Sequence, residues 1–97
     1  MAYELNYKGF EENLVEAKNP DIWGKATYKF EFKNSYGANV SVCDRTRFRT
    51  LWCLAGTRVD EFGNKRICWN IPGVMGDIET YLTDKDVRKL LAMIKEL

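Results

Sequence analysis

The sequence predicts an α+β fold: a four-stranded, mainly antiparallel sheet with a C-terminal helix packed on one face and a short N-terminal helix or arm. Residues 25–33 alternate between polar and apolar side chains, as a half-buried strand does. Residues 50–59 and 65–71 are two further strand-like segments joined by a short loop containing Gly and Asn, which is typical of a hairpin. Residues 83–97 repeat apolar side chains at helical spacing. Strands followed by a helix are the order of an α+β domain.

Length and composition limit the class of protein. The chain has 97 residues, enough for a single domain (residues 1–97) with one core, and 45% hydrophobic with 30% charged residues is the composition of a folded chain. The formal net charge of +1 gives no overall field that would attract nucleic acid or an anionic membrane. No apolar run approaches the ~20 residues that span a bilayer, and the N-terminus has no signal-peptide pattern. We therefore expect a soluble cytoplasmic protein that does not bind membranes.

The N-terminal residues fit two patterns. Residues 3–7 alternate like a strand, whereas the apolar residues from Phe10 onward lie at helical spacing. We expect a short strand or extended arm followed by a short helix near Phe10 to Lys18. Asn19-Pro20-Asp21 should end that helix, because the residue before a proline avoids the α conformation.

The first hairpin is the strongest strand signal. Its first strand, residues 25–33, places four apolar side chains on one face: Ala26, Tyr28, Phe30 and Phe32. Asn34-Ser35-Tyr36-Gly37 supplies turn residues, and residues 38–42 alternate again as the second strand. The segment 43–49 that follows is interpreted as a connecting loop or an exposed edge.

The second half of the predicted sheet has a central strand. Thr50 to Val59 is apolar on both faces, so we expect it to be covered on both sides. Asp60 to Asn64 is a hairpin loop, and Lys65 to Ile71 is the fourth strand. Val74 to Leu82 should return as a loop with one helical turn.

The C-terminal helix has a clear start and a clear apolar face. Thr83 is an N-cap candidate with Asp86 three residues later, which suits the positive end of the helix dipole. The apolar stripe consists of Val87, Leu90, Leu91, Ile94 and Leu97. We expect Leu90, Leu91 and Ile94 to pack on the aromatic side chains of Phe30 and Phe32.

Catalytic and metal-binding patterns are missing from the sequence. Three cysteines, Cys43, Cys53 and Cys68, form no C-x-x-C pair, and the chain has no histidine. Zinc sites and histidine-based hydrolytic triads need such residues. We expect three reduced thiols, no metal, no cofactor and no enzyme activity.

One cationic segment suggests phosphate binding. Arg45, Arg47 and Arg49 alternate around Phe48. Guanidinium groups bind phosphate oxygens well, and an aromatic ring between them can stack on a base, so a nucleotide or nucleic acid is a possible partner. The alternative is a solvated loop whose arginines pair with nearby carboxylates, among them Asp44, Glu31 and Asp60.

Two other groups of residues suggest protein binding. Asp77 and Glu79, close in sequence to Asp84 and Asp86, would form an acidic face for a basic groove on a protein. The alternative is that Asp84 and Asp86 serve only the start of the helix. Tyr36 at the first hairpin, with the tryptophans and Tyr81, would form an aromatic interaction surface, which includes a homodimer through an open strand edge.

Two blocks of the chain resemble a family of small uncharacterised proteins of tailed bacteriophages and prophages. The first block is Pro20-Asp21-Ile22-Trp23-Gly24, the aromatic strand and the Asn34-x-Tyr36-Gly37-Ala38-x-Val40 turn. The second is Leu51 to Ala55, Ile78 to Thr83 and the terminal helix. The chain departs from the family pattern at residues 44–49 and 68–72.

The resemblance implies a phage origin and no particular reaction. With no catalytic group recognised, we expect a phage accessory protein that binds a host protein non-covalently in the bacterial cytoplasm, such as an inhibitor of a bacterial defence system of the anti-CRISPR kind. The alternatives are a nucleotide- or nucleic-acid-binding module that uses Arg45 to Arg49, and a structural homodimer without a ligand.

Overall fold

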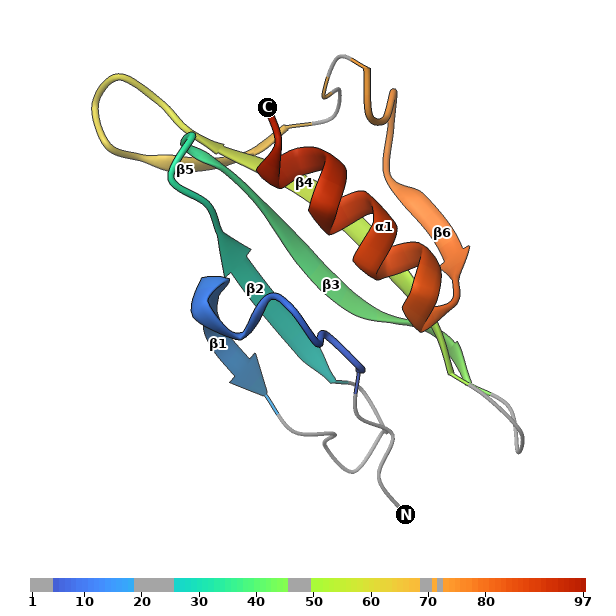
Figure 1. The fold of residues 1–97 in the computed structure, drawn as a ribbon. Coiled ribbons are helices and arrows are strands. Elements are labelled where there is room, and N and C mark those ends of the chain that lie inside the picture. Colours follow the sequence, from blue (N-terminus) through green and yellow to red (C-terminus); the bar gives the residue numbers. More distant parts are fainter. Residues whose placement is uncertain (1–4, 19–25, 46–49, 69–70, 72) are drawn as a thin grey trace.

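The computed structural model describes residues 5–18, 26–45, 50–68, 71 and 73–97 (Figure 1). In these residues the chain forms a short 3₁₀ helix, six strands and one α-helix. Their bounds are η1 Glu11–Asn13, β1 Leu14–Lys18, β2 Thr27–Glu31, β3 Tyr36–Arg45, β4 Thr50–Val59, β5 Lys65–Cys68, β6 Glu79–Leu82 and α1 Asp84–Lys95. No helix in this described part is long and apolar enough to cross a membrane.

The strands form one antiparallel sheet in the order β1-β2-β3-β4-β5, and β6 pairs with β4. The predicted α+β class and the C-terminal helix are confirmed, but the prediction of four strands is wrong because the sheet has six. The central place of β4 is confirmed, since β3 lies along one edge and β5 and β6 share the other. On the face of β4 opposite the helix, Leu51 is buried whereas Cys53 and Ala55 are half-buried, so this face is covered in part.

The helix predicted near Phe10 to Lys18 is the first error. Only Glu11–Asn13 is helical, and Leu14–Lys18 is strand β1, which pairs with β2 from Leu14 opposite Phe30 to Lys18 opposite Thr27. The free edge of β2 supplies hydrogen-bond partners for this backbone, whereas a helix of this length is marginal without tertiary packing. Sheet pairing therefore overrides the helical spacing of the apolar residues.

The other two differences concern the long central strands. β3 continues to Arg45, so Cys43 to Arg45 is part of a strand and not of a connecting loop. The predicted loop Val74 to Leu82 ends in strand β6, which pairs with the first half of β4 through Trp52 opposite Leu82. Since β5 pairs only with residues 56–59 of the ten-residue β4, the remaining edge is free to take a second short strand.

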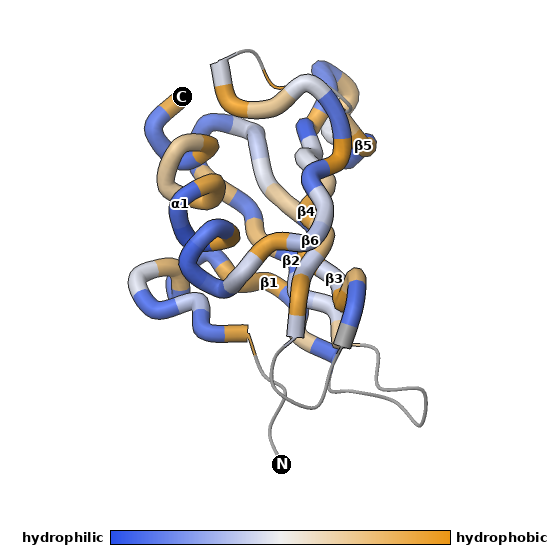
Figure 2. The backbone as a smooth tube through the Cα atoms, turned by 90° about the vertical axis from the view of Figure 1, so that its right-hand side faces the viewer, coloured by the Kyte–Doolittle hydropathy of each residue, from blue (hydrophilic) through white to orange (hydrophobic). Residues whose placement is uncertain are grey.

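Helix α1 and the N-terminal arm, residues 5–10, cover the same face of the sheet (Figure 1). The view in Figure 2 shows α1 to one side of β3, β4 and β5. The buried core includes Tyr28, Phe30, Val40, Trp52, Leu54, Ile71, Val87, Leu91 and Ile94. Among the described residues this is one continuous apolar cluster.

The arm covers the aromatic side chains of β2 directly. The ring centroids of Tyr7 and Tyr28 lie 5.7 Å apart, and those of Phe10 and Phe32 lie 6.4 Å apart. Leu91 and Ile94 are fully buried, but Leu90 is only half-buried at the border of the core. The stabilising contribution of this helix face therefore rests on Leu91 more than on Leu90. The helix lies mainly over β3 and β4, so its packing on Phe30 and Phe32 stays a prediction.

Side-chain hydrogen bonds satisfy backbone groups at both ends of α1. Thr83 and Asp86 form the predicted capping box. Asn34, in the β2–β3 turn, donates from Nδ2 to the carbonyl oxygens of Ile94 at 2.8 Å and Leu97 at 3.1 Å. Because the last carbonyls of a helix have no partner within it, Asn34 acts as a C-terminal cap.

Candidate functional site

The β4–β5 hairpin extends past the C-terminal end of α1 and forms what we call the hairpin arm, residues 58–68 (Figure 1). Its strands pair Arg58 with Arg66 and Val59 with Lys65. The connection, residues 60–64, was predicted as a hairpin loop, and this is confirmed. The loop of the arm therefore projects beyond the helix-covered part of the sheet (Figure 1).

Asp60 holds the loop in one conformation. Its Oδ1 accepts hydrogen bonds from the backbone N–H groups of Phe62 and Asn64, both at 2.9 Å. The Asp60 N–H donates to the Asn64 carbonyl at 2.9 Å, and Gly63 takes a positive φ of 82°. The hydrogen bonds from the loop backbone, together with Arg66, keep the pKa of Asp60 below its usual value. The loop is therefore ordered by local contacts.

Phe62 is the most exposed large apolar residue in the described part of the chain, with 80% of its surface accessible. Ile67, on β5, is 43% exposed. Phe62 donates its own N–H to Asp60 Oδ1, and the next residue, Gly63, donates to the Asp60 carbonyl oxygen, so the backbone that carries the ring is held by Asp60. An exposed aromatic side chain on an ordered loop is a typical anchor for protein binding.

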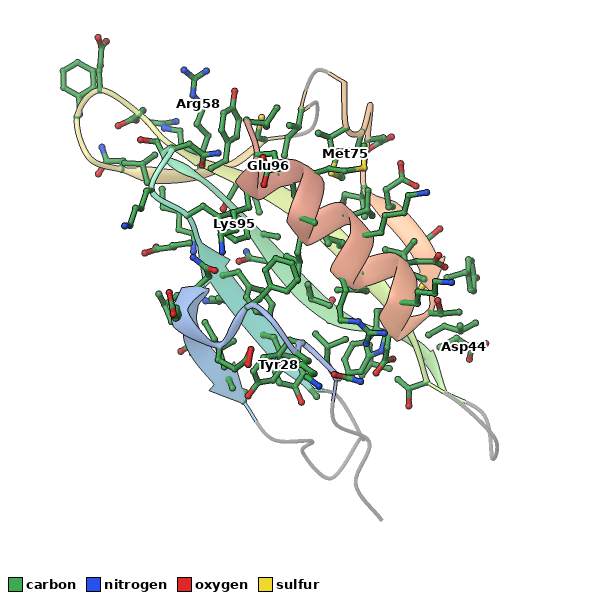
Figure 3. All side chains as sticks on the ribbon, viewed as in Figure 1. Tyr28, Asp44, Arg58, Met75, Lys95 and Glu96 are labelled. Atoms are coloured by element: carbon green, nitrogen blue, oxygen red, sulfur yellow. The ribbon has the colours of Figure 1, made fainter. Side chains whose placement is uncertain are left out.

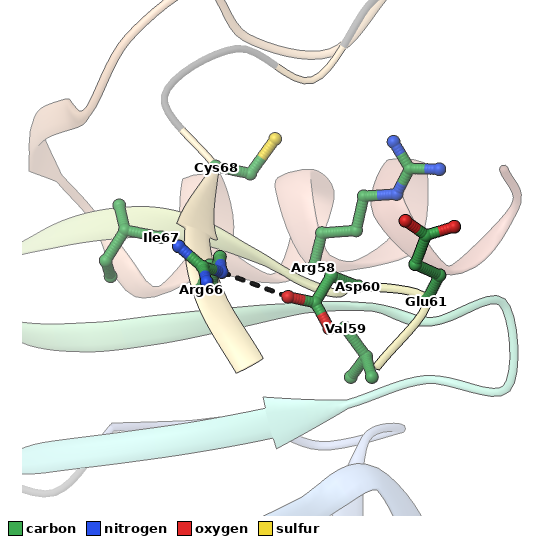
Figure 4. Close-up of a pocket in the computed structure, with 7 residues that line it drawn as sticks. All are labelled: Arg58, Val59, Asp60, Glu61, Arg66, Ile67 and Cys68. Atoms are coloured by element: carbon green, nitrogen blue, oxygen red, sulfur yellow. Dashed lines mark hydrogen bonds and ion pairs between the residues drawn. The ribbon is translucent and has the colours of Figure 1, made fainter. Parts of the chain in front are cut away.

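A shallow pocket of about 440 Å³ lies at the base of the arm, lined by residues from β4, the loop and β5 (Figure 4). In Figure 4 the side chains of Arg58 and Cys68 point to one side of the hairpin and that of Val59 to the other. Arg66 donates from Nε to Asp60 Oδ2 at 3.0 Å. The guanidinium carbon of Arg58 lies 5.5 Å from the ring centroid of Tyr36. Tyr36 was a predicted site residue, and the structure places it beside this pocket.

Phe62 was not among the predicted site residues, because residues 60–64 were predicted only as a hairpin loop. A signal was present. A phenylalanine in the middle of a tight polar loop, between Glu61 and Gly63, has no neighbouring apolar residue with which to form a core face. Such a residue is expected to be exposed, and an exposed Phe is a reason to look for a partner.

The arginine segment lies mostly outside the described residues. Arg45 ends β3, and Arg47, Phe48 and Arg49 fall in the range 46–49 that the structure leaves undescribed. Two of the carboxylates considered as partners have other contacts: Glu31 binds Lys65 at 3.4 Å, and Asp60 binds Arg66. Figure 3 shows Asp44 and Arg58 at opposite ends of the sheet. Nucleotide or nucleic-acid binding by this segment stays a prediction, and it would be separate from the hairpin arm.

The acidic residues divide between two roles. Asp84 accepts from the Trp52 indole N–H and the Asn6 N–H, both at 2.8 Å, and Asp86 completes the capping box. Asp77 is exposed and accepts from the Ile78 N–H at 2.7 Å, and Glu79 begins β6. Asp86 serves the start of the helix as the alternative reading predicts, whereas Asp84 joins the helix to the sheet and the N-terminal arm. The acidic face of Asp77 and Glu79 stays a prediction.

Of the predicted aromatic surface, Trp52 belongs to the core and Tyr81 is 65% exposed. Trp23 and Trp69 lie outside the described residues. The edge strand β1 has a register shift after Leu14 and carries Glu16 and Lys18, features that discourage pairing with another chain. A homodimer through a strand edge stays a prediction.

Within the ranges that the structure describes, no group of three or more His, Cys, Asp or Glu side chains is arranged to hold a metal ion. No protein-family model, curated protein or solved structure matches this chain. The resemblance to phage proteins therefore stays a prediction based on the quoted sequence blocks.

Proposed function

We propose that this protein is a non-catalytic binding module that docks on another protein through its hairpin arm. The observation that carries the proposal is the 80% exposure of Phe62 on a loop that Asp60 holds in place. A large apolar side chain left in water is unfavourable for the free protein, and it becomes favourable once a partner covers it.

The energetics fit an anchor residue. Burying a phenylalanine side chain fully contributes about 1.5 to 3 kcal/mol. Because Asp60 already orders the loop, little conformational entropy is lost when the ring enters a pocket. The exposed Arg58, stacked on Tyr36 at the base of the arm, adds guanidinium donors at the rim.

The expected partner surface follows from these side chains. It has an apolar pocket wide enough for an aromatic ring, with carboxylates beside it to pair with Arg58. The resemblance to phage proteins makes a bacterial host protein the expected partner, and a defence protein the first class to test. The protein would then inhibit the defence protein by occupying a surface that the defence protein needs for its activity.

A pull-down from bacterial lysate with matched variants tests the proposal. Wild-type chain, Phe62→Ala and Val15→Ala are immobilised side by side. Val15 is also an exposed apolar residue, 55% accessible, but it lies on β1 away from the arm. We expect one stoichiometric host protein to be retained by the wild type and by Val15→Ala and to be lost with Phe62→Ala. Truncation of a central anchor should weaken binding by 2 kcal/mol or more, roughly 30-fold.

Three results would contradict this assignment. Equal retention by Phe62→Ala would remove the hairpin arm from the binding surface. Nucleotide or nucleic acid that copurifies, seen as excess absorbance at 260 nm, would favour the arginine segment. A stable dimer by size-exclusion mass measurement, with no host protein retained, would favour the homodimer.

A further inference from the structure

Cys43 and Cys53 come together on the face of the sheet that α1 does not cover. Val42 and Trp52 are paired across β3 and β4, and the Trp52 side chain is buried under the helix. Because side chains alternate along a strand, the residue that follows each of them turns to the opposite face. Both thiols are half-buried there, so a small reagent can reach them.

An irregularity in the strand pairing brings the two sulfur atoms close. The register of β3 and β4 shifts between Val42 and Asp44, so Cys43 is the extra residue of a bulge. Cys53 pairs with Ser41, so Cys43 is its neighbour on the same face of the two strands, close enough to raise the pKa of Cys53. In a regular ladder the two residues would lie diagonally across the strands.

Strand β6 places a third group, the backbone N–H of Tyr81, beside the two thiols. The pairing of β4 with β6 shifts between Trp52 and Leu54, directly beside Cys53. At this point Tyr81 adopts a positive φ of 56°, and its backbone N–H lies where it lowers the pKa of Cys53. A non-glycine residue with this φ is strained, and such strain is concentrated at functional sites. Burial and the neighbouring Cys43 raise the pKa of Cys53 to about 12, and the Tyr81 N–H acts in the opposite direction.

We infer that Cys43 and Cys53 form a two-thiol site that reacts with low-molecular-weight disulfides, such as oxidised glutathione, and closes to an intramolecular disulfide. The thiolate of Cys43 attacks one sulfur of the oxidised glutathione, whose S–S bond breaks and releases one glutathione thiolate. Cys53 then loses its proton to solvent and attacks the Cys43 sulfur, which releases the second glutathione. The protein loses two electrons and two protons, and one oxidised glutathione becomes two reduced ones.

The surroundings of Cys53 suit its role as the second nucleophile. The Tyr81 N–H is placed to favour the Cys53 thiolate from which the second attack starts. Once Cys43 is joined to glutathione, it no longer competes as a charged neighbour of Cys53. Cys68 is excluded from the reaction by position, because it packs against the core from β5, opposite Gly56.

The experiment treats the full chain with oxidised glutathione, blocks remaining thiols by alkylation and maps the peptides by mass spectrometry. We expect a monomer that has lost two hydrogens, with Cys43 linked to Cys53 and Cys68 alkylated. Cys68→Ser is the matched control and should form the same link. Cys43→Ser and Cys53→Ser should form no internal link. In a fixed glutathione redox buffer, the linked fraction should be larger for the folded chain than for the chain unfolded in guanidinium chloride.

Four outcomes would overturn the inference. They are a glutathione adduct that persists on Cys43 or Cys53 of the wild type, a link that involves Cys68, a disulfide between two chains, and a linked fraction no larger in the folded chain than in the unfolded one. Because the thiol pair lies apart from the hairpin arm, these results do not depend on whether the arm binds a partner.

Discussion

Two aspartates organise opposite ends of this molecule in different ways. Asp84 accepts hydrogen bonds from Asn6 and Trp52, which are 78 and 32 residues away in the chain. The Asp60 carboxylate accepts hydrogen bonds from Phe62, Asn64 and Arg66, all within six positions of it in the chain. The first joins helix, sheet and N-terminal arm, whereas the second shapes one loop. A contact that joins distant segments contributes to global stability, and a local contact orders a surface without being needed by the core.

The largest effect is expected in the core below the helix. Leu91→Ala should lower the free energy of unfolding by about 2 to 5 kcal/mol, because the side chain is fully buried and a cavity is left. Leu90→Ala is the matched control, since Leu90 is the neighbouring leucine and only half-buried. Urea denaturation measures both. A loss for Leu90→Ala as large as that for Leu91→Ala would contradict the packing described for α1.

Asp84→Ala should cost about 1 to 3 kcal/mol, because the buried indole N–H of Trp52 loses its acceptor. Denaturation followed by tryptophan fluorescence measures this cost. Asp84→Asn keeps an oxygen that can accept from Trp52 and should be milder. If Asp84→Ala were as stable as the wild type, the role of Asp84 in joining the three segments would be wrong.

The local role of Asp60 is tested by pH. Its pKa in the folded protein is lower than in the unfolded chain, so its contribution is fully present above the unfolded value of about 3.9 and is lost as the pH falls through the folded value. We expect the backbone amide resonances of Phe62 and Asn64 to shift together with a midpoint below that value. In Asp60→Asn, which cannot ionise, this shift should be missing. A midpoint at or above 3.9 would contradict the contacts described for the loop.

Phe62→Ala should have the smallest effect on stability, within about 0.5 kcal/mol, because the ring is exposed and contributes little to the core. Thermal unfolding compared with the wild type measures it. The same variant should lose partner binding in the pull-down, so that the loss of binding cannot result from unfolding. A loss of stability comparable with that of Leu91→Ala would show that the ring packs against the protein and is not available as an anchor.

The parts of the fold that the sequence predicted are those with long, regular patterns. The apolar stripe of residues 83–97 and the alternation of residues 25–33 each suffice for one element, and α1 and β2 were found there. β1 and β6 have five and four residues, and their conformation depends on free edges of β2 and β4 that local sequence does not reveal. Pairing with β2 and β4 therefore determines that these two segments are strands.

The candidate site was harder to predict for a similar reason. Tyr36 was proposed from its place in a turn, and its stacking with Arg58 depends on the β3–β4 register. Phe62 could have been proposed from its polar neighbours alone. The proximity of Cys43 and Cys53 could not, because a bulge in one strand and a register shift in another bring the sulfur atoms and the Tyr81 N–H together.

The hydrogen bonds of Asn6 have a consequence for the order of events during synthesis. Asn6 binds Asp84 through its N–H and Arg88 through its carbonyl oxygen, so both bonds join the N-terminal arm to α1, which follows the six described strands in the sequence. β1 to β4 can begin to pair while the ribosome is still adding residues. These bonds cannot fasten the N-terminal arm until α1 has been synthesised and has left the ribosome. Until then the aromatic side chains of β2 are without their full cover, and this is the interval in which the new chain is most exposed to aggregation.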